Sequence, residues 1–245
     1  MQNWPNPQCP PEGRGLFLSG CRAAIPIAVG YIPIGITFGL LAKAAGLPNH
    51  IIILMSLVIF AGASQFVAVN LLTLGTAGYE IVLTTLVLNL RHLLMSASLS
   101  QKVDQRSSKK YLALLSFGIT DETFMVASIR EDPALPQEFL LGLNLLAFTA
   151  WNAGTWMGVF LAGGLPLIIQ NSMGIALYVM FIGLLVPACR NSRPALFIAL
   201  LAMAIHGLLF YQPLFASLSV GLKIMITTIS TALLGAIMFG REEQA

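Results

Sequence analysis

Four ionisable side chains interrupt two long apolar stretches of this chain. Arg91 and His92 lie within one stretch, and Asp121 and Glu122 lie within the next. A charged side chain at the centre of a membrane-spanning helix costs roughly 2.5–3.5 kcal/mol on insertion scales. We therefore predict that these four groups pair with one another, with water, or with a polar ligand that crosses the membrane.

Two of these groups are acidic and two are basic, which is the combination that a zwitterion requires. Arg91 can bind a carboxylate, and Asp121 or Glu122 can bind an ammonium group. The many Val, Leu, Met and Phe residues around them can enclose an aliphatic side chain. A carboxyl group deep in the membrane or His92 can also carry a proton. The alternative is a purely structural Arg–acid pair between helices.

The first of these stretches carries a polar stripe. Four residues follow helical i, i+4, i+7 and i+11 spacing along one face: Thr85, Asn89, His92 and Ser96. Arg91 points about 100° away from this face, since a helix has 3.6 residues per turn. We therefore expect the four ionisable groups not to form one cluster. One acid faces the stripe, and the other pairs with Arg91 or Lys223.

Further candidate pathway residues lie in two other apolar stretches. Residues 61–65 form a small-residue run that includes Gly62 and Ser64 and ends at the amide of Gln65. An exposed helix end in this run can bind a carboxylate. Asn152 is a second polar residue in an apolar stretch, and Trp156 can serve as a pocket wall or as an aromatic anchor at the membrane surface.

Two basic residues near the C-terminus are weaker candidates. Lys223 lies inside an apolar stretch, and we expect its side chain to extend towards the membrane surface. His206 lies beside Gly207, and we expect it to make a hydrogen bond between helices rather than to bind a ligand.

The composition is that of a membrane protein. Hydrophobic residues make up 57% of the chain and charged residues 9%, whereas a soluble domain averages about 25% charged residues. Eight apolar segments are long enough for helices that cross or enter a bilayer: 23–45, 51–74, 81–99, 112–129, 139–165, 173–189, 194–211 and 214–239. We predict an all-α polytopic membrane protein, with a polar tail at 1–22 and one transmembrane domain at 23–240.

The positions of the basic residues do not fit eight simple crossings. With every segment crossing once, the Lys and Arg residues would be shared evenly between the two sides, contrary to the positive-inside rule. The N-terminus and the basic loops at 102–110 and 190–193 face one side only if one segment in each group of three is re-entrant or broken. The candidates are residues 61–65 of the second segment and residues 151–154 of the fifth.

Glycine patterns predict close helix packing and an internal repeat. Gly35–Gly39 and Gly154–Gly158 are both GxxxG pairs, which allow helix backbones to approach closely. The sequences GLLAKAAGLP, ending at Pro48, and GVFLAGGLP, ending at Pro166, are similar and lie 118 residues apart. Two structural repeats with broken helices would be typical of a secondary transporter.

Other functions are disfavoured by the motifs. The chain has no GxxxxGK[ST] motif for ATP and no HExxH motif, and its three histidines (His50, His92 and His206) lack metal-ligand spacing. We therefore predict neither an enzyme nor a cofactor or metal site. The net charge of +3 is too small and too scattered to predict nucleic-acid binding.

Three motifs resemble a known family. FAGASQF (60–66), LNLRHLLMSASL (88–99) and TDETF (120–124) are similar, in this order and spacing, to motifs of the AzlC-type branched-chain amino acid permeases. Within that family the chain is most similar to the large, YgaZ-type subunits of bacterial L-valine exporters. The family motif has Asn or Asp at the position of Asn89, and the neutral residue here argues against a proton carrier at that position.

The resemblance implies a multi-pass protein of the bacterial inner membrane that exports L-valine, with leucine, isoleucine and methionine as further substrates. It also implies a small membrane partner of the AzlD/YgaH type. Export would be coupled to protons or would run downhill as uniport. The alternatives are a channel-like or structural subunit that is active only with its partner, and an exporter of another small organic solute.

Overall fold

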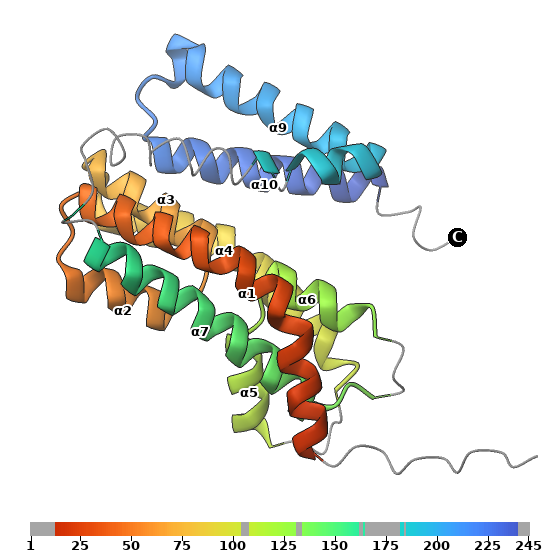
Figure 1. The fold of residues 1–245 in the computed structure, drawn as a ribbon. Helices are drawn as coiled ribbons and strands as arrows, with labels where there is room; N and C mark the ends of the chain where they lie inside the picture. The colour runs from red at the N-terminus through yellow and green to blue at the C-terminus, as the bar shows by residue number, and fades with distance from the viewer. Residues whose placement is uncertain are drawn as a thin grey trace, which may run out of the picture.

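The structure is a computed structural model that describes residues 13–103, 108–130, 134–161, 164, 182–183 and 185–239. In this part of the chain the regular structure is entirely helical, as predicted. Two layers are visible in Figure 1: α9 and α10 form one layer, and the helices from α1 to α7 form the other.

Two long parallel helices form the centre of the larger layer. They are α1 (Gly13–Ala44) and α7 (Gln137–Leu161). A Cβ atom added at Gly20 would lie 2.0 Å from the carbonyl oxygen of Phe139, and one at Gly39 would lie 2.4 Å from that of Thr155. Both helices therefore run in the same direction, and only glycine allows this approach.

The two GxxxG pairs are part of this contact. An added Cβ at Gly35 would lie 2.7 Å from the carbonyl oxygen of Trp151, and one at Gly158 would lie 2.2 Å from that of Ile36. The prediction that these glycines allow close helix packing is confirmed. The repeated GLP sequence is not tested, since its second copy lies partly outside the described residues.

The second apolar segment is broken into α2 (Asn49–Ile59) and α3 (Gly62–Thr73). The Ser56 and Thr155 hydroxyls lie 2.9 Å apart, and the Phe60 ring centroid lies 5.1 Å from that of Phe148. Successive residues of α2 thus contact successively earlier residues of α7, so the two helices are antiparallel. The chain then turns at Phe60, whose φ of 36° and ψ of 45° are left-handed.

The helix α3 returns to the end of the bundle from which α2 came. Gly62 packs on the Trp151 ring, and the Phe66 ring lies 5.5 Å from the Phe38 ring. Phe38 lies about two helical turns further along α1 than the level of the chain reversal at Phe60. Contacts therefore advance along α1 as they advance along α3, so the two helices are parallel. We call α2 and α3 the first hairpin. The break that was predicted at residues 61–65 is confirmed.

The helix α4 (Gly78–Ser100) runs along the bundle in the direction opposite to α1. At its C-terminal end the carbonyl oxygen of Lys102 accepts a hydrogen bond from the N–H of Leu135, at 2.7 Å, just before α7 begins. At the same end, Gly13 at the start of α1 contacts Glu138. We call this the basic end of the bundle, because most of the described Lys and Arg residues lie there.

The fourth segment is also broken, into α5 (Lys109–Phe117) and α6 (Asp121–Ser128). The helix α5 runs inward from the basic end, because Leu115 accepts a hydrogen bond from Asn144 and the Phe117 ring lies 5.9 Å from that of Phe148. The helix α6 returns to the basic end, where the carbonyl oxygen of Ser128 accepts a hydrogen bond from Lys102. We call this pair the second hairpin.

The prediction that the fifth segment is broken near Trp151–Gly154 was wrong. The helix α7 is continuous there, since the Asn152 amide bonds to its own helix and Gly154 provides the space for α1. The break lies at residues 118–120 of the fourth segment instead. An added Cβ at Gly118 would lie 2.5 Å from the Asn144 side chain, and Thr120 caps a new helix.

The second layer consists of α9 (Arg193–Tyr211), η2 (Pro213–Phe215) and α10 (Val220–Phe239). His206 hydrogen-bonds Thr227 at 3.3 Å, so its predicted role as a contact between helices is confirmed. Lys223 is only 8% exposed, and its ammonium lies over the Phe210 ring, 5.5 Å from the centroid. The expectation that Lys223 extends to the membrane surface was wrong, because it packs inside the helix layer.

The second layer contacts the larger one through α4 and α10. The Ser219 hydroxyl donates a hydrogen bond of 2.5 Å to the buried carboxylate of Glu80, at the start of α4. A Cβ added at Gly221 would lie 2.9 Å from the Thr84 hydroxyl. The start of α10 therefore lies at the end of the bundle opposite the basic end.

Four of the described helices are long and apolar enough to cross a membrane: α1, α4, α9 and α10. The prediction of eight apolar segments is not confirmed in this form. Segments two and four are pairs of short helices, and most of segment six (173–189) lies outside the described residues.

Candidate functional site

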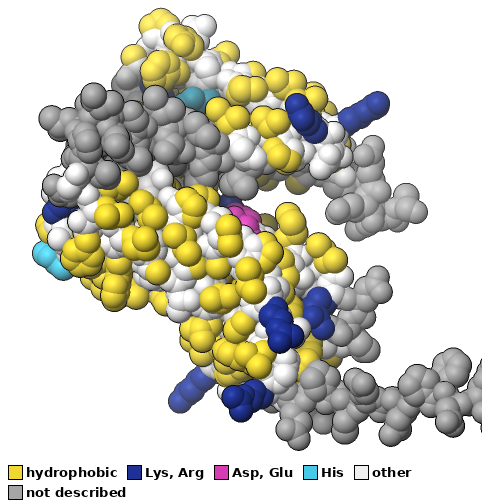
Figure 2. Space-filling model, in the orientation of Figure 1, with side chains coloured by type: hydrophobic (Ala, Val, Ile, Leu, Met, Phe, Trp, Pro, Cys, Tyr) yellow, Lys and Arg dark blue, Asp and Glu magenta, His cyan; other side chains and the backbone are white. Residues whose placement is uncertain are grey.

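A cavity of about 440 Å³ lies where the tips of the two hairpins meet. Its polar walls come from three helices and the tip of the second hairpin: Tyr31, Arg91, His92, Thr120, Asp121 and Glu122. The tip of the first hairpin contributes residues 60–63, and α7 contributes Trp151. In Figure 2, an acidic side chain is visible in the hollow between the two layers, on a surface that is otherwise mainly apolar.

Arg91, His92, Asp121 and Glu122 all line this one cavity. The expectation that they do not form one cluster was wrong. Asp121 and Glu122 are the first two residues of α6, at the hairpin tip rather than in mid-helix. Adjacent residues of a helix point about 100° apart. The cavity extends around enough of α4 that Arg91 and His92 both line it.

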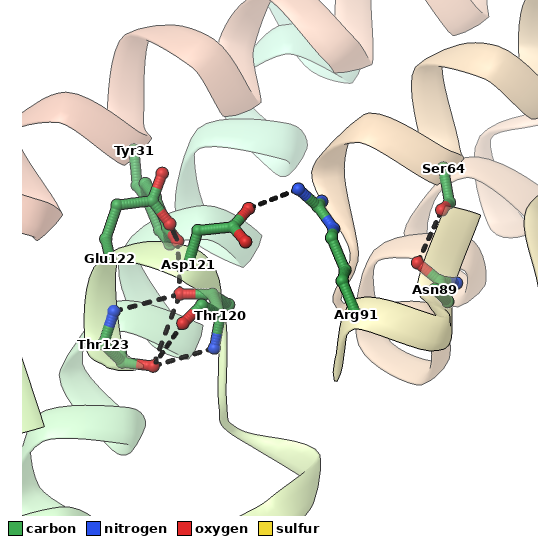
Figure 3. Close-up of polar contacts among 8 residues, drawn as sticks. All are labelled: Tyr31, Ser64, Asn89, Arg91, Thr120, Asp121, Glu122 and Thr123. Carbon is green, nitrogen blue, oxygen red and sulfur yellow. Dashed lines mark hydrogen bonds and ion pairs between the residues drawn. The ribbon is translucent and has the colours of Figure 1, made fainter. Parts of the chain in front are cut away.

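Arg91 and Asp121 form an ion pair across the cavity, with 2.5 Å between nitrogen and oxygen. Their side chains are 42% and 48% exposed, respectively. The pair joins α4 to the second hairpin, and its atoms remain accessible from the cavity (Figure 3). An accessible pair of opposite charges can be opened by a ligand that carries both charges.

Glu122 has a different partner. Its carboxylate lies within short hydrogen-bonding distance of the Tyr31 hydroxyl, which also lies 2.7 Å from the hydroxyl oxygen of Thr120 (Figure 3). Tyr31 is 7% exposed and packs edge-on against the ring of Trp151. Glu122 is therefore connected to α1 through a neutral side chain.

The local sequence explains why the acids are held at this tip. The Thr120 hydroxyl accepts the N–H of Thr123 at 3.3 Å, and the Thr123 hydroxyl accepts the N–H of Thr120 at 2.8 Å. This reciprocal cap starts a helix at Asp121. Acidic side chains in the first turn also interact favourably with the positive end of the helix dipole.

The tip of the first hairpin brings the N-terminus of a helix to the cavity wall. Ala61 precedes α3 and has no side chain that can cap it. The first N–H groups of a helix have no partner within the helix, so those of Gly62 and Ala63 are available to the cavity that these residues line. An added Cβ at Gly62 would lie 2.8 Å from the Trp151 ring, so only glycine fits this wall.

Three of the predicted pathway residues stabilise the tip of the first hairpin through hydrogen bonds outside the cavity. The Ser64 hydroxyl donates a hydrogen bond of 2.6 Å to Asn89, which connects α3 to α4 (Figure 3). The amide oxygen of Gln65 accepts the indole N–H of Trp151 at 3.0 Å. None of Ser64, Gln65 and Asn89 lines the cavity.

Of the remaining predicted residues, Asn152 and Trp156 lie outside the cavity and His92 lines it. Asn152 is buried and bonds to the carbonyl of Phe148 in its own helix, and Trp156 is 45% exposed and outside the cavity. His92 does line the cavity, and its Nε2 is buried with no hydrogen-bond partner among the described residues.

Sequence reasoning missed Tyr31 and Thr120. Tyr31 stands alone as a polar ring in an apolar segment, and its partner is 91 positions away in the chain. Thr120 could have been identified, because a threonine before two acids is a local signal for a helix N-terminus.

Comparisons with known proteins agree with the resemblance. The model of the family described as AzlC protein matches residues 26–165, which include all the polar cavity residues. The inner membrane protein YgaZ of Escherichia coli K12 is 31% identical over 215 residues, which cover 85% of this chain and 87% of YgaZ.

Two further relatives are similar. An uncharacterized membrane protein of Archaeoglobus fulgidus is 34% identical over 78% of this chain and 85% of its own length. The branched-chain amino acid transport protein AzlC of Bacillus subtilis is 33% identical over 58% of this chain and 56% of its own length. No solved structure matches the chain.

Proposed function

The chain belongs to the AzlC family, and from its cavity we propose that it is a secondary transporter subunit that exports branched-chain amino acids. L-valine is the first expected substrate, and leucine, isoleucine and methionine are the others. The observation that carries the proposal is the accessible ion pair of Arg91 and Asp121 inside the cavity.

A zwitterionic amino acid can replace this pair with two contacts of its own. The substrate carboxylate binds the Arg91 guanidinium and the free N–H groups at the start of α3, where both charge and helix dipole favour an anion. The ammonium group binds the carboxylate of Asp121. Arg91 and Asp121 each face an opposite charge both before and after the exchange, so neither becomes an isolated ion.

The remaining cavity wall selects the side chain of the substrate. It is apolar and partly aromatic: Ile34, Phe60, Met125, Trp151 and Leu185. An aliphatic side chain buries its surface here at about 25 cal/mol per Å² of apolar area. A charged side chain would have to lose its hydration against this apolar wall, which favours valine, leucine, isoleucine and methionine over lysine or glutamate.

We propose that the basic end of the bundle faces the cytoplasm. The helices α9 and α10 are antiparallel, since Gly235 packs on Ile198 and His206 bonds to Thr227. Because α10 begins at the opposite end, α9 begins at the basic end. The described basic residues at or near this end are Arg14, Arg22, Lys102, Lys109, Lys110, Arg130, Arg190 and Arg193. Lys43 and the buried Lys223 lie towards the opposite end, as the positive-inside rule allows for a minority of residues.

With this orientation both hairpins are re-entrant. The first hairpin enters the membrane from the outside and the second from the cytoplasm, while α1 and α4 cross it. The 25-residue helix α7 is packed along α1 and crosses with it. The tips meet at the cavity, so that each hairpin separates the cavity from one side. Broken helices that meet near mid-membrane are a common way to build a transport site. The proposed location is the bacterial inner membrane.

The proposed partner is a small membrane subunit of the AzlD/YgaH type. A channel-like or purely structural subunit is the second candidate, and exchange kinetics separate the two. The purified protein, alone and with the small subunit, is reconstituted in liposomes loaded with unlabelled valine, and uptake of labelled valine is measured. We expect saturable exchange that leucine, isoleucine and methionine inhibit and that lysine does not. Flux that does not saturate, or no flux of any of the four substrates, contradicts the proposal.

A further inference from the structure

We propose that Glu122 is the proton-binding group of the transport site and that Tyr31 transmits its protonation to the tip of the second hairpin. This inference rests on the proposed function and assigns its coupling site. It separates the roles of two adjacent acids that the sequence leaves equivalent.

The two acids differ in what protonation would cost. Asp121 has a guanidinium at 2.5 Å, so a proton on Asp121 would abolish an ion pair. Glu122 has no Lys or Arg within ion-pairing distance among the described residues, and its partner is the phenol of Tyr31. A proton on Glu122 therefore preserves every hydrogen bond at the site and only exchanges donor and acceptor.

The phenol of Tyr31 makes this exchange possible. A phenol has one hydrogen to donate and an oxygen that accepts, yet two acceptors lie close to it, on Glu122 and Thr120. When Glu122 is ionised it can only accept, so Tyr31 donates to Glu122. When Glu122 is protonated it donates to the Tyr31 oxygen, and the Tyr31 hydrogen is free to bond Thr120.

This change has a mechanical consequence. Tyr31 lies on α1, which is packed through glycine contacts on α7, whereas Thr120 is the residue that caps α6 at the hairpin tip. The protonation of Glu122 therefore decides whether the single hydroxyl hydrogen of Tyr31 is directed to the carboxylate of α6 or to its cap at Thr120.

The other ionisable groups at the cavity are consistent with one exchangeable proton. Arg91 and His92 face it from α4, Asp121 from α6 and Tyr31 from α1, while the described parts of α3, α7 and residues 185–190 contribute none. Arg91 and Asp121 neutralise each other, so the charge that remains on the polar cavity wall is that of ionised Glu122. A substrate ammonium beside Asp121 is attracted by ionised Glu122 and released when Glu122 takes up a proton.

The predicted stoichiometry is exchange of one proton for one amino acid. The proton binds the Glu122 carboxylate from the outer side as the substrate leaves, and it dissociates to the cytoplasm before the next substrate binds. No other group needs to change its charge.

Glu122→Gln tests this assignment, because glutamine imitates the protonated acid. Liposomes with an acidic lumen are expected to accumulate labelled valine through the wild-type protein, by antiport of protons. Glu122→Gln is expected to lose this accumulation, while valine–valine exchange continues at a higher half-saturating valine concentration, because Arg91 and Asp121 still bind the substrate and the attraction of Glu122 is lost. Tyr31→Phe is expected to slow exchange and to weaken the dependence of the exchange rate on pH. The control is Glu138→Gln, which removes an acid outside the cavity and leaves both activities unchanged.

Asp121→Asn separates the two acids. It is expected to reduce exchange and accumulation together, since it removes a substrate contact. Proton-driven accumulation by Glu122→Gln, or an exchange-only phenotype in Asp121→Asn instead, would overturn the assignment while leaving the proposed function intact. Failure of the wild type to exchange valine would contradict the proposed function itself.

Discussion

Replacement of Arg91 with glutamine is expected to weaken valine binding far more than it weakens folding. The ion pair with Asp121 is about half exposed on both sides, and exposed pairs contribute roughly 0.2–1 kcal/mol to stability. In the proposed substrate complex, by contrast, the guanidinium donates a charge-assisted hydrogen bond to the substrate carboxylate, and the bound substrate shields this bond from water. Such bonds are worth roughly 1.5–3 kcal/mol.

This difference sets the expected magnitudes. A loss of roughly 1.5–3 kcal/mol raises the dissociation constant for valine about 10- to 150-fold, since 1.4 kcal/mol corresponds to a factor of ten. The free energy of unfolding should fall by no more than about 1 kcal/mol. Equilibrium binding of labelled valine and thermal unfolding, both on the same detergent-solubilised protein, measure the two effects.

The double variant Arg91→Gln/Asp121→Asn makes the test sharper. If each side chain contacts a different end of the substrate, the loss in the double variant should exceed the sum of the two single losses by about the energy of the ion pair, because each single variant already removes the cost of opening that pair. A large drop in unfolding temperature with unchanged valine affinity would refute the reasoning and would assign the pair a structural role only.

Two further predictions concern the scaffold. Gly39→Ala should lower the unfolding temperature by an amount equivalent to about 1–3 kcal/mol, since its Cβ would lie 2.4 Å from a backbone carbonyl of α7. Gly30→Ala is the matched control, as no heavy atom lies within 4 Å of its added Cβ. Equal effects of the two substitutions would refute the packing argument. For the orientation, Lys43→Cys in intact cells with a permeable outer membrane should react with a membrane-impermeant maleimide, whereas Arg193→Cys should react only after the inner membrane is opened. The opposite pattern would invert the bundle.

Local patterns predicted the features that depend on a few neighbouring residues. The glycine pairs indicated the contact of α1 and α7, because a GxxxG pair can be recognised within a single helix. The small residues at 61–65 indicated the break between α2 and α3. The positions of the basic loops predicted one re-entrant or broken segment among segments one to three and another among segments four to six. The structure has a broken segment in each group, the second and the fourth.

The errors arose where distant residues decide the structure. The position of the second break depends on the contact of Gly118 with Asn144 and on the cap at Thr120, not on the composition of the fifth segment. The four ionisable groups form one cluster because Asp121 and Glu122 lie at a hairpin tip, which places them opposite Arg91. The partner of Glu122 is on a helix 91 residues earlier, and no periodicity in either segment indicates that contact.

The proposed cavity binds a zwitterion by opening the pair of Arg91 and Asp121. Displacement of labelled valine from the purified protein by analogues that keep the branched chain and lack one charge tests this directly. Isovalerate lacks the ammonium group and isobutylamine lacks the carboxylate. We expect leucine to displace valine and neither analogue to do so at the same concentration. Displacement by either analogue as effective as that by leucine would contradict it.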